Sequence, residues 1–284
     1  MEYLLDVLFQ LLPLGPIALE DPGYRSTYRS VENLHRAFVS IGLDEHGIRP
    51  DALSASGAGA AYVTPSHQFP LGVTMPAPRR AELLRWAYGL AGRYIVEDDY
   101  DSEFRYSSRP IPAMQGQDKG GRVIYTGTFS RSIAPSIRAA YLILPEGLLP
   151  LYREKFAHGA STVSRFEQWV LARFLSSGQY ARHLRRVGNL YRSRCAALTE
   201  ALEGAFPQGR VTGNDAGLHL LFTLPGREDG ELAAAAEAAG YAVHTLGEYC
   251  HGPSPRPGTL VLGFAGLDAE RAGKAVHDLR RAFG

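Results

Sequence analysis

Short apolar segments alternate with helical patterns through the first half of the chain. The apolar segments lie at 16–21 (PIALED), 60–65 (AAYVTP), 94–99 (YIVEDD), 123–130 (VIYTGTFS) and 139–145 (AAYLILP). A helix is expected from Pro78 to Leu90, because proline is tolerated in a first helical turn. This alternation is typical of an α/β domain with a mainly parallel sheet. Ligands bind beyond the carboxyl ends of strands in such sheets, so residues at those ends are the candidates for chemistry.

The second half of the chain has a different pattern. From about 148 to 206 arginine is frequent, and Phe166, Val170 and Phe174 recur at helical spacing, which predicts long helices. Strand-like runs then lie at 218–224, 241–246 and 259–265, followed by a closing helical pattern. We therefore expect three parts. These are a large α/β domain at 1–147, connecting helices at 148–206 and a small C-terminal α+β domain at 207–284.

The first segment predicts an amphipathic helix. Leucines recur at helical spacing within residues 4–12, and Glu2 and Asp6 interrupt the apolar run, which disfavours a signal peptide. No uncharged apolar run reaches the roughly 18 residues of a membrane span, so no membrane contact is expected. Because the helix begins without a cap or a preceding strand, we expect the large domain to be incomplete at its N-terminus.

Composition and charge exclude several classes of protein. Hydrophobic residues make up 45% of the chain and charged residues 21%, as in ordinary globular proteins. The formal net charge of +1 provides no overall field for attracting nucleic acid. Cys195 and Cys250 are too few for a disulfide scaffold and lack zinc-binding spacing. A cytoplasmic protein is expected.

Three polar stretches follow predicted strands. EDDYDSEF (97–104) carries five carboxylates in seven positions, so some must be paired or protonated unless the stretch is a solvated acidic loop. It lacks the glycine of a calcium-binding EF-hand loop. GTFSRSIAPSIR (127–138) places Thr128, Ser130 and Arg138 around a turn, a set suited to phosphate. TPSHQFPLG (64–72) is a proline-bounded loop that carries His67.

Taken in order, PGY, PSHQFP, EDDYDSEF and TFS-x-S-x-x-P-x-x-R resemble the aminotransferase-like domain of MocR-type (GabR-type) transcription regulators. The resemblance runs over essentially the whole chain. It implies fold type I of the transferases that depend on pyridoxal 5'-phosphate (PLP), with class I/II aminotransferase ancestry and PLP as the cofactor. It also implies a homodimer, an amino acid or amine effector, and DNA binding only through a segment absent from this chain.

The resemblance also implies roles for individual residues. Asp98, with Asp99 as the alternative, matches the carboxylate that keeps the pyridinium nitrogen of PLP protonated, so that the ring acts as an electron sink. Tyr100 matches the tyrosine at the phenolic oxygen, and His67 lies in the loop that reaches this edge. Tyr24 matches the aromatic residue that stacks on the ring, although a buried turn tyrosine has the same appearance in sequence. The phosphate end is matched by Thr128, Ser130 and Arg138.

The chain departs from the family at the Schiff-base lysine. That lysine stands in TFS-K-S, and here the position is Arg131. A guanidinium stays protonated, so it can act neither as the amine nucleophile nor as the general base of transamination. The three lysines of the chain are Lys119, Lys155 and Lys274, and none follows a predicted strand. We therefore expect non-covalent PLP and little or no transaminase activity.

Two other features weaken the match to an active enzyme. Where the family often has the arginine of LSRY as a clamp for the substrate carboxylate, this chain has LGEY with Glu248. A carboxylate there would repel an amino acid's carboxylate unless it is paired or protonated. The glycine-rich turn that cups the phosphate would lie just before Met1. Two alternatives stay open, namely an active aminotransferase acting on amino acids and a dimerisation module without a ligand.

Overall fold

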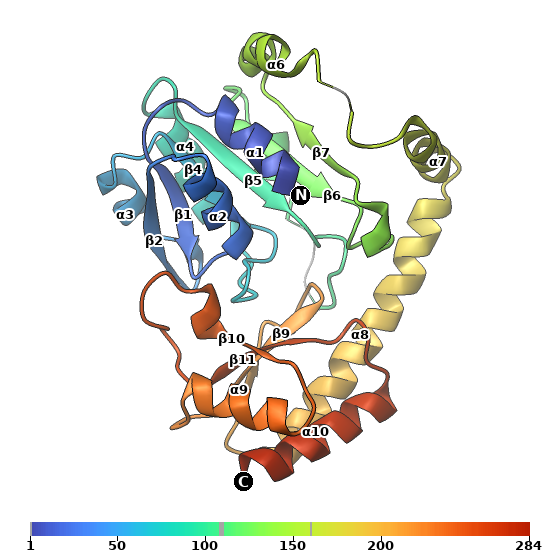
Figure 1. Ribbon diagram of the computed structural model, residues 1–284. Coiled ribbons are helices and arrows are strands. Elements are labelled where there is room, and N and C mark those ends of the chain that lie inside the picture. The colour runs from blue at the N-terminus through green and yellow to red at the C-terminus, as the bar shows by residue number, and fades with distance from the viewer. Residues whose placement is uncertain (1, 108–110, 160) are drawn as a thin grey trace.

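The computed structural model describes residues 2–107, 111–159 and 161–284, and it contains two sheets joined by a long helix (Figure 1). The larger sheet has the order β3-β2-β1-β4-β5-β6-β7. Its strands are β1 (Ile17–Asp21), β2 (Phe38–Asp44), β3 (Gly47–Ile48), β4 (Ala60–Val63), β5 (Tyr94–Asp99), β6 (Val123–Thr128) and β7 (Ala140–Ile143). The strands from β2 to β6 are parallel, and only β3 and β7 pair antiparallel. The predicted α/β class with a mainly parallel sheet is confirmed.

Helices cover both faces of the larger sheet. Helices α1 (Glu2–Leu11) and α2 (Arg25–Asn33) pack on one face, and α3 (Pro50–Ala55) and α4 (Ala77–Tyr88) pack on the other. Alternation along β1 shows why, because Ile17 and Leu19 join the α1 cluster whereas Ala18 joins the α4 cluster. The strands are therefore apolar on both faces, as the uninterrupted apolar runs of the sequence predict.

The smaller sheet is antiparallel, with the order β10-β11-β9-β8. Its strands are β8 (Arg210–Thr212), β9 (His219–Thr223), β10 (His244–Thr245) and β11 (Thr259–Gly263). It packs against α8 (Gln179–Ala205), α9 (Asp229–Ala238) and α10 (Ala269–Phe283) through a core that includes Leu202, Phe222 and Val276. Helix α8 continues from α7 (Arg165–Ser176), which follows α6 (Leu149–Phe156). In Figure 1, α6 and α7 lie at the end of the molecule opposite the smaller sheet.

Several elements differ from the sequence interpretation. Strands β2, β3 and β8 were not predicted, and the predicted run 241–246 forms a strand only at His244–Thr245 before a short 3-10 helix, η3 (Leu246–Tyr249). The two remaining short elements that bear on the site are α5 (Met114–Gln117) and η1 (Pro135–Ile137). In the part of the chain that the structure describes, no helix combines the length and the apolar character needed to cross a bilayer.

A buried ion pair holds the loops at the carboxyl end of the sheet. Arg80 of α4 is fully buried and donates hydrogen bonds to the carbonyl oxygens of Pro65, Met75 and Pro112. Its guanidinium lies 3.6 Å from Glu97 of β5, whose carboxylate accepts bonds from two backbone amides at the start of α5. The loops that follow β4 and β5 are therefore fixed to α4.

Candidate functional site

A pocket of about 390 Å³ opens at the carboxyl ends of β5 and β6. Seven of the nine residues that the sequence singled out line it, namely Tyr24, Asp98, Tyr100, Thr128, Ser130, Arg131 and Arg138. The remaining lining residues are Glu2, Thr64, Phe69 and Pro135, which the sequence interpretation did not select. The pocket thus lies where ligands bind in doubly wound sheets.

Asp98 is the buried carboxyl group of this pocket. Its side chain is only 4% exposed, and its Oδ2 accepts a hydrogen bond from the Tyr62 hydroxyl. Its Oδ1 is buried and has no hydrogen-bond partner among the described residues. Burial raises the pKa of Asp98 to about 7, and the Tyr62 bond opposes that rise. A cationic N–H donor at Oδ1 would satisfy the oxygen and favour the carboxylate.

Asp99, the alternative to Asp98, already has partners. Its Oδ2 accepts bonds from the Tyr125 hydroxyl at 2.6 Å and the Ser102 hydroxyl at 2.7 Å. Neighbouring residues of a strand point to opposite faces of the sheet, so Asp98 and Asp99 cannot both face the pocket. The geometry therefore favours Asp98 over Asp99 as the residue available to a ligand.

Another part of the pocket lining carries positive charge and hydroxyl groups. Thr128 ends β6, and its Oγ1 accepts a bond from the Ser130 amide at 3.2 Å. Arg138 follows η1 with a left-handed backbone (φ 43°). Arg131 and Arg138 are both exposed at the pocket. Two guanidinium groups and two hydroxyls provide the donors that a phosphate group requires.

Aromatic side chains form another wall. Tyr24 precedes α2 and is half-buried, and its ring meets that of Phe69 edge to face at 5.9 Å between centroids. Phe69 also packs edge to face against Tyr100 and Tyr249. Sequence reasoning missed Phe69, although its place between His67 and a proline in the PSHQFP loop was a usable signal.

Tyr100 connects the pocket to His67. The Tyr100 hydroxyl donates to the His67 carbonyl oxygen at 2.8 Å and lies 3.1 Å from Nδ1 of the same residue. Burial raises the pKa of Tyr100 well above its usual value. His67 itself is 1% exposed and does not line the pocket, because its ring lies behind Tyr100 at 3.0 Å from Asp101.

Glu20 is a second buried carboxyl group that the sequence interpretation did not select. It lies near the end of β1, where Oε2 accepts bonds from the Thr64 amide, the Thr64 hydroxyl and the Gln68 side chain. Burial raises its pKa to about 7. Its position one residue before the end of the first apolar run was the available signal.

Glu248 lies away from the pocket, in a hollow of about 220 Å³ that also contains Arg25 and Arg29. Its Oε1 accepts a bond from the Thr245 amide, and its Oε2 lies 3.0 Å from His244 Nδ1. Partial burial raises the pKa of Glu248, but these two bonds outweigh it and the pKa falls below its usual value. In this structure Glu248 is the third residue of η3, and its side chain completes a capping box with the N-cap residue Thr245.

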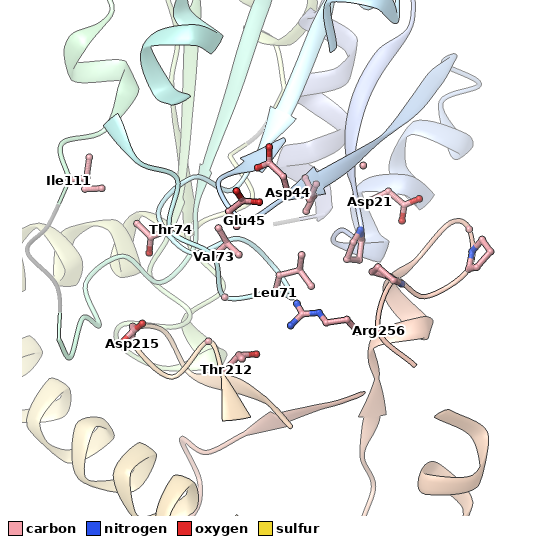
Figure 2. A pocket seen from close by; sticks show the side chains of 18 of the residues that line it. Asp21, Asp44, Glu45, Leu71, Val73, Thr74, Ile111, Thr212, Asp215 and Arg256 are labelled. Atoms are coloured by element: carbon pink, nitrogen blue, oxygen red, sulfur yellow. The ribbon is translucent and has the colours of Figure 1, made fainter. Parts of the chain in front are cut away.

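A larger hollow of about 980 Å³ lies between the two sheets (Figure 2). Asp44 and Glu45 line it from the large sheet, and Asp215 and Arg256 line it from the smaller one. None of the nine predicted site residues is part of its lining. Asp44 already pairs with Arg79 at 2.8 Å.

Comparison with known proteins places this fold in a class. The structure of Pyrococcus horikoshii kynurenine aminotransferase in complex with PMP matches 99% of this chain and 72% of that protein, with a TM-score of 0.87 and 26% identity. The chain therefore has the fold type I architecture of the class I/II aminotransferases, which confirms the predicted fold class. No protein-family model matches the chain.

The sequence relatives include transcription regulators and aminotransferases. An uncharacterized HTH-type regulator of Bacillus subtilis, YhdI, is 38% identical over 98% of this chain and 59% of its own length. The probable rhizopine catabolism regulatory protein MocR of Rhizobium meliloti is 35% identical over 98% of this chain and 57% of its own length. The chain is thus homologous to MocR-type regulators and spans less than two thirds of these relatives. The resemblance predicted from the four motifs is confirmed.

Proposed function

We propose that this chain is the effector domain of a MocR-type regulator, that it binds PLP without a covalent bond, and that it has little or no transaminase activity. Its homology to these regulators and its aminotransferase fold support the proposal. The observation that carries it is the unpartnered, buried Oδ1 of Asp98 in a pocket that also holds Arg131. DNA contact by the whole regulator is proposed to lie outside these residues.

The residues of the pocket fit PLP. When bound, this cofactor supplies a protonated pyridine ring that withdraws electrons from a substrate carbon. Asp98 Oδ1 would accept the hydrogen bond of the ring nitrogen, and Tyr24 would cover the ring face. The phosphate would be held by the side chains of Thr128, Ser130 and Arg138. The ring nitrogen would stabilise the charged form of buried Asp98, because a cationic partner offsets the loss of hydration of the carboxylate.

The absence of a suitable amine supports non-covalent binding. Arg131 lines the pocket at the position of the family's lysine, and no lysine is among the lining residues that the structure describes. Lys155 donates to the Gln10 carbonyl oxygen, and Lys274 pairs with Asp278. Lys119 lies in the loop between α5 and β6. Each of the three amines is thus outside the pocket.

Titration with PLP tests the proposal. We expect saturable binding of one PLP per chain, with no protein-bound cofactor left after borohydride reduction and denaturation. Asp98→Asn should weaken binding about 10- to 100-fold, the value of a hydrogen bond to a charged group. Asp51→Asn is the matched control, because Asp51 is exposed on α3. A trapped adduct would contradict non-covalent binding, and turnover by the unmodified chain would establish the active aminotransferase.

We further propose that the chain forms a homodimer and responds to an amino acid or amine. Support for pairing comes from α7, where Phe166 is 73% exposed, Trp169 59% and Val170 41%. Exposed apolar groups of this size mark association surfaces. Analytical ultracentrifugation should show that the original chain is a dimer. The Trp169→Asp variant should dissociate more readily into monomers. A dimer with no affinity for PLP would select the ligand-free dimerisation module.

A further inference from the structure

Three buried side chains meet behind Tyr100, outside the pocket. His67 follows β4, Asp101 follows β5, and His219 begins β9 of the smaller sheet. Their exposed fractions are 1%, 1% and 8%. One nitrogen or oxygen atom of each lies within 4.8 Å of the other two. The larger and smaller sheets thus contribute to a single cluster of potential ligands.

Two polar atoms of this cluster have no partner among the described residues. They are Nε2 of His67 and Oδ1 of Asp101, and both are fully buried. Leaving such atoms without a hydrogen bond or a metal ion destabilises a folded protein. The cluster therefore lacks a group that the surrounding protein does not supply.

His219 is oriented as metal-binding histidines usually are. His219 Nε2 lies 2.9 Å from the Pro70 carbonyl oxygen, which can only accept, so Nε2 carries the proton and Nδ1 has the lone pair. His67 Nδ1 lies 3.0 Å from Asp101 Oδ2. The ring centroids are 4.9 Å apart. A carbonyl oxygen that fixes the other ring nitrogen, as that of Pro70 does for His219, is a common outer partner of a metal-bound histidine. Asp101 is itself a proposed ligand, so its contact with His67 Nδ1 is a contact between two ligand atoms that can face one ion.

We propose that His67, Asp101 and His219 bind one divalent transition-metal ion, with water completing the coordination. Two imidazoles and one carboxylate are ligands that suit Zn²⁺, whereas Mg²⁺ and Ca²⁺ prefer oxygen alone. Two ligand atoms bonded at about 2.0–2.2 Å lie at most about 4.4 Å apart, so rotation of the side chains has to close the present 4.8 Å spread.

Such an ion would join the two sheets next to the cofactor pocket. His219 is the ligand from the smaller sheet, and the other two belong to the larger one. His67 also accepts the Tyr100 hydrogen bond at its carbonyl oxygen, so the ion would hold the residue that positions Tyr100. This inference does not depend on PLP binding and is tested without PLP.

The test uses the untagged chain, stripped with a chelator and dialysed against Zn²⁺. We expect one bound Zn²⁺ per chain and a higher melting temperature than that of the stripped chain. When Co²⁺ replaces Zn²⁺, we expect the visible absorption bands of Co²⁺ with few ligands, all of them nitrogen or oxygen atoms. His219→Gln and Asp101→Asn should each reduce the affinity at least about tenfold, because even outer-shell changes cost 10- to 100-fold. Circular dichroism of both variants would establish that they are folded.

Two controls separate this site from adventitious binding. His244→Gln removes an exposed histidine, and Cys250→Ser removes a half-buried thiol, and neither should change the affinity. The proposal is overturned if the chain takes up no Zn²⁺, if both cluster variants bind as the original does, or if Cys250→Ser abolishes binding.

Discussion

The Tyr62 hydroxyl donates a hydrogen bond to Oδ2 of Asp98 between neighbouring parallel strands. Tyr62 pairs in register with Val96, two residues before Asp98, so both side chains lie on the same face of the sheet. Both are almost fully buried, at 3% and 4% exposure. Tyr62 is therefore the internal donor that partly replaces water for the Asp98 carboxylate.

Tyr62→Phe should raise the pKa of Asp98 further above about 7. The substitution removes the donor that opposes the effect of burial. We expect a rise of about one pH unit, from a bond worth roughly 1.5 kcal/mol. Carbon-detected NMR titration of the aspartate carboxyl groups measures it. Tyr152→Phe is the control, since Tyr152 is exposed on α6. An unchanged Asp98 titration would show that burial alone sets the pKa.

Asp98 should make the chain less stable as the pH rises from about 4 to about 7. Its pKa is about 7 in the folded protein against 3.8 for the ordinary group. Between these values the unfolded chain has lost the proton and the folded chain keeps it, so unfolding releases a proton and becomes easier as the pH rises. The full effect, on the order of 4 kcal/mol, is reached above pH 7.

Asp98→Asn isolates this contribution. The variant should gain stability relative to the original chain above pH 7 and gain least near pH 4, as measured by urea unfolding without cofactor. Burial lowers the pKa of His219 to about 4, which gives the opposite slope, but this term is common to both chains and cancels in the difference. A stability difference that does not vary with pH would contradict the raised pKa of Asp98.

Arg80→Met should destabilise the chain by about 3–5 kcal/mol. It removes the partner of a buried carboxylate, Glu97, and three hydrogen bonds to loop carbonyl oxygens. Arg49→Met is the control, because its pair with Asp51 is exposed to solvent and should contribute little to stability. Thermal unfolding of the two variants compares them. Equal losses would mean that the buried pair does not fix the loops after β4 and β5.

The sequence predicts the pocket better than it predicts the surroundings of the pocket. Parallel strands bring their carboxyl ends to one edge, so residues such as Asp98 and Thr128, which end apolar runs or follow them closely, had to meet. Strand β2 was not predicted from the sequence. Its side chains are mostly half-buried, so its hydrophobic pattern is weaker than that of a strand covered on both faces. Strands β3 and β8 have two and three residues, too few for a periodic signal.

Long-range contacts were beyond the reach of sequence patterns. His67 was expected at the cofactor edge, yet its ring packs with His219, which is 152 positions further along the chain and belongs to the other sheet. Glu248 stands at the family's carboxylate-clamp position in sequence, but its side chain completes the capping box of η3 and contacts His244. Both outcomes depend on how the smaller sheet docks on the larger one, which no local spacing encodes.

Arg131→Lys should convert non-covalent PLP into a cofactor that borohydride links to the chain. Arg131 is exposed at the pocket, so the change restores a primary amine there without disturbing the core. An amine attacks the PLP aldehyde and forms a reducible carbon–nitrogen bond with loss of water, which a guanidinium does not do. Mass spectrometry of the reduced, digested chain would locate the adduct at residue 131.

Arg29→Lys is the matched control, because it adds an amine on the exposed face of α2, outside the pocket. It should give no adduct above that of the original chain. If the Arg131→Lys variant also transfers an amino group to a keto acid, the remaining residues still support the aminotransferase reaction. If Arg131→Lys binds PLP but gives no adduct, residue 131 does not reach the aldehyde, and the substitution at this position is not what prevents covalent binding.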